Sequence, residues 1–284
     1  MLRLGIIGAE SSHTNAFLDL LQQRTDTVVT AICGENEEAL KKITDKYHLQ
    51  CVVDSPADMV GKADAVLVTL RDGAAHLEAV RPLIGHNIAV WVDKPFTVSV
   101  SDAKELLRLF KENHTIFSGG TSIKMSAELH LLKQKYQEIG DECLSGYLAY
   151  QTYLDGPYSG MHFYSHHLIE SMLSVFGFGI RSVLAKRSGD SLAAIASYDG
   201  FNVLMNFGVM APPLYVGVFG QKSSFMTQYR ADDGLALQLE EFLTAVKQKK
   251  SPYPPEFFLT AVKVCNAVEI SMTEEREVYM EEID

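Results

Sequence analysis

The stretch LRLGIIGAESSHTNAFLDLL, residues 2–21, decides the fold of this chain. Its residues 3–8 form a short apolar run that ends at Gly8, which is typical of a strand that passes into a turn. Beyond Ser11, a residue that can cap a helix, apolar side chains recur at helical spacing. The stretch therefore predicts a strand, a tight turn and a helix in direct succession.

The same alternation of strand and helix continues as far as residue 117. We expect strands at residues 27–33, 51–53, 65–70, 88–92 and 115–117, and helices at 37–47, 76–84 and 101–113, the last with Ser101 as its N-cap. Strands that alternate with helices form parallel sheets with right-handed crossovers. The predicted fold class is therefore α/β, with residues 1–120 forming a Rossmann-like, doubly wound domain.

Beyond Gly119 and Gly120 the pattern changes, and residues 121–284 predict a second, α+β domain. The expected elements are a helix at 126–139, strands at 143–153, 181–186, 191–198, 201–207 and 215–219, and helices at 235–247 and 257–273. Asp199-Gly200 lies between two of these strands and is a hairpin signal. Because short connections join antiparallel strands, we expect an open, mainly antiparallel sheet.

The composition is that of a folded protein that does not bind nucleic acid. Hydrophobic residues make up 47% of the 284 residues and charged residues 21%, which excludes intrinsic disorder. The formal net charge is −11, whereas binding to a phosphate backbone needs a basic surface. The short basic stretch at residues 247–250 is expected at a helix C-terminus, where cations are favourable.

Four scattered cysteines indicate a reducing compartment. Cys33, Cys51, Cys143 and Cys265 show neither a CxxC pair nor the spacing of a disulfide framework, which also argues against a zinc finger. No run approaches the ~18 apolar residues that a membrane span requires, and the N-terminus lacks a signal-peptide pattern. We therefore expect a cytoplasmic protein with no membrane partner.

The first candidate site is the turn Gly8-Ala9-Glu10-Ser11-Ser12-His13 after the first strand. In Rossmann domains a dinucleotide pyrophosphate lies here, because glycines allow a tight turn and helix N-terminal amides face the anion. Against the template G-x-G-x-x-G, Glu10 replaces the second glycine and His13 the third, so a plain strand-to-helix turn is the alternative. A carboxylate about 5 Å from a phosphate charge, at an effective dielectric of about 20, repels it by roughly 3 kcal/mol. We expect Glu10 to weaken dinucleotide binding unless it turns to solvent or accepts a hydrogen bond from Ser11, Ser12 or His13.

A lysine follows the apolar strand 88–92, in the segment WVDKPF of residues 91–96. Ligands of open α/β sheets bind outside the carboxyl ends of the strands, so Lys94 is expected to point toward that crevice. The alternative is an exposed lysine without a function.

Histidines are concentrated in a third segment, residues 160–170. On a helix, His162, His166 and Glu170 share one face at i, i+4 and i+8, and His167 pairs with Glu170 at i, i+3. This spacing would allow a metal site, but no cysteine or aspartate cluster joins it in the sequence, and neutral histidines often transfer protons instead. We therefore expect no bound metal.

Together these features resemble the glucose-fructose oxidoreductase/inositol dehydrogenase/MocA family of NAD(P)-dependent oxidoreductases over essentially the whole chain. The matching segments are LRLGIIGA, VLVTLRDGAAHLEAVRPLI, VWVDKPF, HHLIESMLSVFG and SPYPPEFFLTAVKVCNAVEISMTEEREV. The resemblance implies a dehydrogenase that transfers hydride between NAD or NADP and a CH–OH group of a sugar- or cyclitol-like substrate. It also implies a homo-oligomer, a dimer or tetramer.

The resemblance also implies roles for individual residues. Lys94 lies beside the nicotinamide and the substrate, and His167 is the acid/base group, with Glu170 in place of the family's Asp after the His. Hydride transfer from a secondary alcohol needs such a proton acceptor and a positive group for the developing alkoxide. The expected cofactor contacts are Gly8, Ala9, Glu10, Ser11, Ser12, Thr69, Leu70, His76 and Lys94, and the expected substrate contacts are His162 and His166.

The sequence departs from the family pattern at three places. Phe163 stands four residues before His167, where the family has an Asp, Cys33-Gly34 replaces the acidic residue expected after the second strand, and Glu10 lies in the turn. These departures keep open a catalytically silent ligand-binding or regulatory protein of the same fold. A metal-dependent lyase or hydrolase built on the face that carries His162 is a third possibility.

Overall fold

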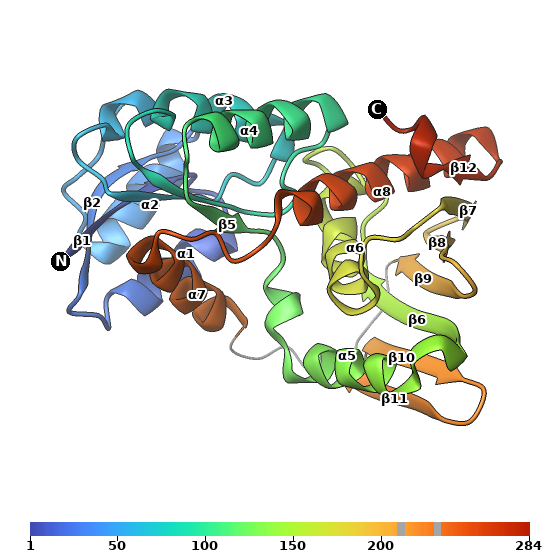
Figure 1. Cartoon of the computed structure of the whole chain (residues 1–284). Coiled ribbons are helices and arrows are strands. Elements are labelled where there is room, and N and C mark those ends of the chain that lie inside the picture. The colour runs from blue at the N-terminus through green and yellow to red at the C-terminus, as the bar shows by residue number, and fades with distance from the viewer. Residues whose placement is uncertain (209–213, 230–233) are drawn as a thin grey trace. The chain divides into compact units, whose positions relative to one another are not determined.

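The computed structural model describes residues 1–208, 214–229 and 234–284, which divide into two compact units (Figure 1). The first unit comprises Met1–Thr97, Asp102–Gly120 and Leu235–Pro254. The second comprises Val98–Ser101, Thr121–Gly234 and Pro255–Asp284. Each unit has its own sheet and is described separately. No helix in the described ranges is long and apolar enough to cross a membrane.

The first unit is built on a five-stranded parallel sheet with the order β2-β1-β3-β4-β5. Its strands are β1 (Leu2–Ile7), β2 (Thr27–Cys33), β3 (Ala65–Val68), β4 (Ala89–Val92) and β5 (Phe117–Gly119). Its helices are α1 (Ser12–Leu21), α2 (Glu37–Tyr47), α3 (His76–Val80), α4 (Val100–Glu112) and α7 (Gly234–Gln248). All residues of β3 and β4 are buried, as strands covered on both faces must be.

Three details of the first unit differ from the sequence-based prediction. The expected strand 51–53 is reduced to one isolated bridge between Val52 and Ile32. The segment that contains Lys94 therefore follows the fourth strand of the chain instead of the fifth. The expected helix 76–84 ends at Val80 and continues as a 3-10 turn, because Pro82 lacks the amide that an α-helix needs. Ser101 lies inside α4, which begins one residue earlier, and is therefore not its cap.

The core of the first unit includes a helix from late in the chain. Trp91 of β4 meets Phe17 of α1 edge to face, with ring centroids 4.9 Å apart. Leu239, Phe242 and Leu243 of α7 belong to the same buried cluster. The sequence pattern places 235–247 in the second domain, whereas the structure groups this helix with the first unit.

The second unit is built on a seven-stranded sheet with the order β11-β10-β6-β9-β8-β7-β12. Its strands are β6 (Cys143–Gln151), β7 (Ser182–Ser188), β8 (Ser191–Ser197), β9 (Asn202–Gly208), β10 (Leu214–Gly220), β11 (Ser224–Tyr229) and β12 (Val278–Tyr279). Its helices are α5 (Ala127–Ile139), α6 (His162–Phe176) and α8 (Pro255–Glu274). The β6–β9 pair is parallel and the other pairs are antiparallel, so the predicted fold class is confirmed.

Helices cover one face of this second sheet. A Cβ on Gly146 would lie only 2.4 Å from the ring of Phe176. The absence of a side chain at this position of β6 therefore lets α6 pack close to the strand. Alternate residues of β8 and β9 are buried under the helices, and those between them are more exposed. The expected hairpin at Asp199-Gly200 joins β8 to β9. The strands β11 and β12 were not predicted from the sequence.

We predict that Phe242→Ala destabilises the first unit by about 3–5 kcal/mol, because the variant leaves a cavity in its core. Trp91 is the single tryptophan of the chain and lies in that core, so its fluorescence reports unfolding of the first unit during denaturant titration. Leu237→Ala, at an exposed position of the same helix, is the control and should cost less than about 1 kcal/mol. Equal effects of the two variants would show that α7 does not complete this core.

Candidate functional site

The turn after β1 needs glycine at position 8. Gly8 has a φ of +116°, and a Cβ there would lie 2.8 Å from the amide nitrogen of Leu70 and 2.9 Å from the carbonyl carbon of Thr69. The hydroxyl of Thr14 donates to the Gly8 carbonyl at 3.0 Å and lies 2.7 Å from that of Thr69. The backbone ends of β1 and β3 and the start of α1 are therefore held together as in a dinucleotide-binding turn.

The N-terminus of α1 begins directly beyond this turn. Ser11 is its N-cap, and its side chain accepts a hydrogen bond from the His13 amide at 3.1 Å. Ala9 is buried, and Ser12 is the first residue of the helix. These residues place helix amides where an anion is favourable.

Glu10 has a specific partner that differs from those expected. Its Oε1 accepts a hydrogen bond of 2.7 Å from Nδ2 of Asn36, which is also the N-cap of α2. Neither Ser11 nor His13 is that donor. The exposed carboxylate of Glu10 is thus tied to the residues that follow β2.

The end of β2 is apolar where the family has an acidic residue. A Cβ on Gly34 would come within 2.9 Å of the Cβ of Ala9, so the chain after β2 packs directly on the turn. Burial raises the pKa of the Cys33 thiol to about 12. This edge therefore carries a neutral thiol, and the nearest carboxylates in sequence are the exposed Glu35 and Glu37.

A partly buried contact between Asp93 and His13 joins the chain after β4 to α1. Oδ2 of Asp93 lies 2.7 Å from Nδ1 of His13, and Oδ1 accepts a hydrogen bond of 2.7 Å from the Lys94 amide. Although burial opposes ionisation, His13 and then Lys94 hold the pKa of Asp93 below its usual value. An ionised carboxylate therefore lies at the carboxyl end of β4, beside the first turn of α1.

Lys94 and His76 lie at the same edge of the sheet. Lys94 is buried and precedes Pro95 through a cis peptide bond. His76 is fully buried, with Nε2 3.0 Å from the Leu70 carbonyl and Nδ1 3.1 Å from that of Phe96. Because both ring nitrogens already face backbone carbonyls, His76 joins the chain after β3 to the chain after β4. Its expected cofactor contact stays a prediction.

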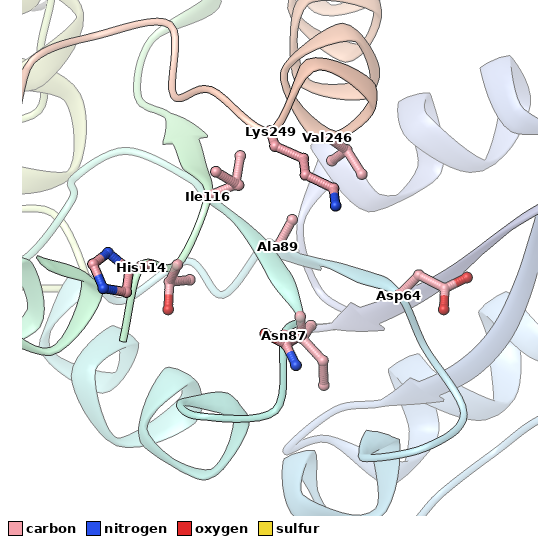
Figure 2. Close-up of a pocket in the computed structure, with 9 residues that line it drawn as sticks. Asp64, Asn87, Ala89, His114, Ile116, Val246 and Lys249 are labelled. Carbon is pink, nitrogen blue, oxygen red and sulfur yellow. The ribbon is translucent and has the colours of Figure 1, made fainter. Parts of the chain in front are cut away.

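The groove shown in Figure 2 lies at the other edge of this sheet. It has a volume of about 530 Å³ and is lined by residues at the starts of strands and by α7, among them Asp64, Asn87, His114 and Lys249. Ligands of open α/β sheets bind at the carboxyl ends of the strands, so this groove is not the expected cofactor site.

In the second unit, His167 is positioned by the chain that enters α5. Its Nδ1 lies 2.7 Å from the hydroxyl of Thr121, and that hydroxyl also accepts a hydrogen bond from the Ile123 amide. The ring of Tyr150 lies beside the imidazole at a centroid distance of 5.1 Å. Nδ1 is thus engaged, which fixes the orientation of the ring.

Glu170 binds the same segment, at the backbone amide of Thr121. Its Oε2 accepts a hydrogen bond of 2.7 Å from the Thr121 amide and lies 3.9 Å from Nζ of Lys124. Its Oε1 lies 3.5 Å from Nδ1 of His166. All these side chains are buried, so Glu170 holds Thr121 in place for His167.

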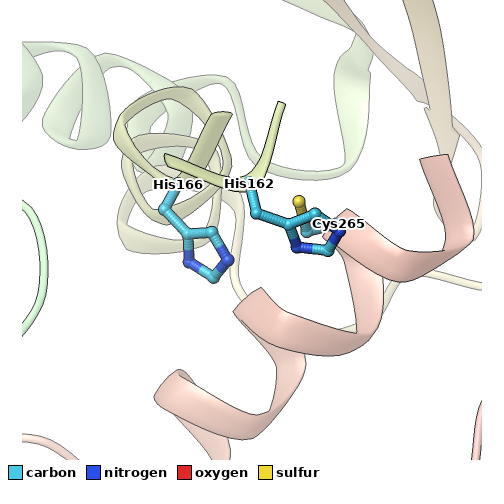
Figure 3. Close-up of side chains that lie close together, drawn as sticks. All are labelled: His162, His166 and Cys265. Carbon is cyan, nitrogen blue, oxygen red and sulfur yellow. The ribbon is translucent and has the colours of Figure 1, made fainter. Parts of the chain in front are cut away.

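His162 and His166 face Cys265 of α8 (Figure 3). One ligand atom from each of the three side chains lies within 4.8 Å of the others. The expectation that no cysteine joins these histidines is therefore wrong, because α8 brings Cys265 to them from a distant part of the sequence. Both histidines are buried, and their expected role as substrate contacts is untested.

The thiol and the imidazoles of this group shift one another's pKa values. Although burial of the thiol opposes it, His162 and then His166 lower the pKa of Cys265 to about 6. Burial likewise opposes protonation of His162, but Cys265 and Glu269 raise its pKa to about 10.

The parallel sheet, the glycine turn and the capped helix define the first unit as a Rossmann-type nucleotide-binding domain. The model of an oxidoreductase family with an NAD-binding Rossmann fold, Gfo/Idh/MocA, matches residues 2–121. Residues 2–121 therefore match this family, in agreement with the sequence segments quoted for that range. A search of curated proteins found no match.

Solved structures of similar fold span the whole chain. A probable dehydrogenase from Thermotoga maritima is 18% identical with a TM-score of 0.88, and the match covers 100% of both chains. Myo-inositol 2-dehydrogenase from Lactobacillus plantarum is 14% identical, with a TM-score of 0.85 and coverage of 98% and 99%. Scyllo-inositol dehydrogenase from Lactobacillus casei, solved with NAD(H) and scyllo-inositol, is 13% identical, with a TM-score of 0.84 and coverage of 99% of both chains. At these identities the likeness establishes the fold alone.

We predict that Asp93→Asn removes a pH-dependent part of the stability of the first unit. A carboxyl whose pKa is lowered by folding stabilises the protein above its unfolded pKa of about 3.9, and this contribution is lost as the pH falls through the lower folded value. Trp91 fluorescence should therefore report a gap of about 1.5–3 kcal/mol between wild type and variant at pH 7 that shrinks in acid. Asp45→Asn, on the exposed side of α2, is the control. A gap that does not change with pH would contradict an ionised Asp93.

Proposed function

We propose that the protein is an NAD(P)-dependent oxidoreductase that acts on a CH–OH group of a sugar- or cyclitol-like substrate. In this proposal the first unit holds the cofactor and the second supplies groups for the substrate. The observation that carries it is the engagement of His167 Nδ1 by Thr121, which fixes the orientation of a buried imidazole that can take a substrate proton. Neighbours of similar fold include two inositol dehydrogenases, which supports the substrate class.

The residues of the first unit fit a dinucleotide. The turn at Gly8 has no room for a side chain, the N-terminus of α1 directly after it is capped by Ser11, and Glu10 is held by Asn36. The expected contacts from Ala9, Ser11, Ser12, Thr69 and Leu70 belong to this proposal. When bound, NAD or NADP supplies the acceptor for the hydride of the substrate carbinol.

Two groups of this chain would handle the proton and the charge. His167 takes the hydroxyl proton at Nε2, since the hydrogen bond at Nδ1 fixes the orientation of its ring. Lys94 stabilises the negative charge that develops on the substrate oxygen. The proton passes to His167 as the hydride leaves, which yields the ketone and a protonated imidazole.

A catalytically silent ligand-binding protein is the second candidate. It is favoured by Phe163, which replaces the family's carboxylate and packs among Tyr158 and Tyr164 at ring distances of 5.5 and 4.8 Å. Such a protein would bind the dinucleotide or a polyol without turnover.

Titration of the full chain with NADH and NADPH, followed by cofactor fluorescence, tests the proposal. Binding of either cofactor together with NAD(P)⁺ reduction on a panel of inositols and sugars would support an oxidoreductase. Binding without turnover on the panel favours the silent protein, and absence of cofactor binding contradicts the oxidoreductase.

We predict that Lys94→Ala lowers kcat/KM at least ~100-fold, as the loss of one preorganised donor does. Lys104→Ala on α4 is the control and should leave activity unchanged. Unaltered turnover of Lys94→Ala would remove this residue from the mechanism.

Thr121 is a positioning residue in this proposal, and its variants test the orientation of His167. Thr121→Val should lower kcat by roughly 10- to 100-fold with little change in KM, because His167 then loses the group that orients it. Thr121→Ser keeps the hydroxyl and should restore most of the rate. If Ser and Val behave alike, the hydroxyl has no such role.

We predict that Glu10→Gln tightens NAD(H) or NADP(H) binding by tenfold or more, because it removes the charge that repels a pyrophosphate and keeps a group that can bond Asn36. Calorimetry on wild type and variant measures the difference. Equal affinities would mean that the hydrogen bond to Asn36 already holds the carboxylate away from the phosphates.

We also propose a homo-oligomer formed through the open face of the second sheet. The register aligns Leu184, Ile195, Leu204 and Tyr147 across neighbouring strands, and Met226 follows beyond Gly217. Leu184, Leu204 and Met226 are 43–50% exposed. Light scattering of Leu204→Arg should report a smaller species than wild type, and a monomeric wild type would contradict the proposal.

A cytoplasmic location without nucleic-acid or membrane partners is part of the same proposal. All four cysteines are free, which agrees with a reducing compartment. The net charge of −11 is unfavourable for nucleic-acid binding.

A further inference from the structure

The group formed by His162, His166 and Cys265 is enclosed within the second unit. The two histidines lie one turn apart on α6, and the cysteine lies on α8. Their exposed fractions are 2%, 0% and 0%. None of them has a role in the proposed hydride transfer.

Polar atoms of this group are left without hydrogen bonds. Nδ1 of His162 and both ring nitrogens of His166 are buried and have no hydrogen-bond partner. Buried polar atoms are costly unless they are satisfied, so a group of them at one place indicates a missing ligand. A ligand that accepts electron pairs suits this space, because a cysteine sulfur and imidazole nitrogens surround it.

A carboxylate lies near one ring nitrogen of each of the two histidines. Oε2 of Glu269 lies 3.1 Å from Nε2 of His162, and Oε1 of Glu170 lies 3.5 Å from Nδ1 of His166. Histidines that ligate metals commonly have a carboxylate at the other ring nitrogen, which orients the ring and raises its basicity. Each histidine here has one nitrogen toward a carboxylate and the other available to a ligand.

We propose that His162, His166 and Cys265 bind a divalent transition metal of the zinc type, which joins α6 to α8. Imidazole and thiolate are the ligands that zinc prefers, and two histidines with one cysteine can occupy three corners of a coordination tetrahedron. Zinc–ligand bonds of about 2.0–2.3 Å place such ligands roughly 3.3–3.7 Å apart. The ligand atoms lie within 4.8 Å, so binding draws them together by about 1 Å, and a water molecule completes the coordination.

Cobalt titration of the full chain tests this site without reference to its activity. Chelator-treated, reduced protein is titrated with Co²⁺, and the spectrum is followed for a thiolate-to-cobalt charge-transfer band and for the intense visible bands of four-coordinate cobalt. We expect one equivalent per chain, and Zn²⁺ should displace it. Cys265→Ser should abolish the charge-transfer band and lower zinc affinity at least 100-fold.

Two further variants separate metal binding from folding. Cys143→Ser changes another buried cysteine of the second unit and should bind cobalt as wild type does. Glu269→Gln changes a half-exposed side chain that cannot disturb the core and should lower zinc affinity 10- to 100-fold. Circular dichroism checks that each variant is folded.

Three outcomes would overturn the proposal. They are absence of the charge-transfer band in folded wild type, equal cobalt binding by Cys265→Ser and Cys143→Ser, and unchanged zinc affinity in Glu269→Gln. None of these measurements depends on cofactor binding, so the metal site can fail while the proposed oxidoreductase stands.

Discussion

The close approach of the Gly8 backbone to the backbone at Thr69 and Leu70 is the constraint on which the candidate site depends. Any side chain at position 8 would overlap the chain that leaves β3. Because this approach fixes where α1 begins, it also sets the position of Ser11 at the helix N-terminus and of His13 above Asp93. The features of this edge thus follow from the absence of one Cβ.

Hydrophobic pattern was sufficient to predict most of the fold. The boundaries of β2 and α2 agree with the prediction, because the first is rich in β-branched residues and the second has a regular helical period. Residues 51–53 failed because three apolar residues cannot distinguish a strand from a single bridge. The edge strand β11 was missed because its exposed and half-buried residues alternate without a strong apolar signal.

The candidate site was less predictable, since its interactions join residues that are distant in sequence. Lys94 and His167 were identified from local motifs, whereas the partners Thr121 for His167 and Asn36 for Glu10 depend on the tertiary structure. Cys265 was noted only as a scattered cysteine. No spacing rule connects it to His162, because they share a site only after α8 packs on α6.

The position of α7 in the sequence has a consequence for biosynthesis. Phe242 completes the core that begins with Leu4, yet nearly all strands of the second sheet are encoded between them. The first unit emerges from the ribosome with part of its apolar surface uncovered until that late helix has been made. Domains generally fold as units during synthesis, so this arrangement ties the completion of the earlier unit to the production of the later one.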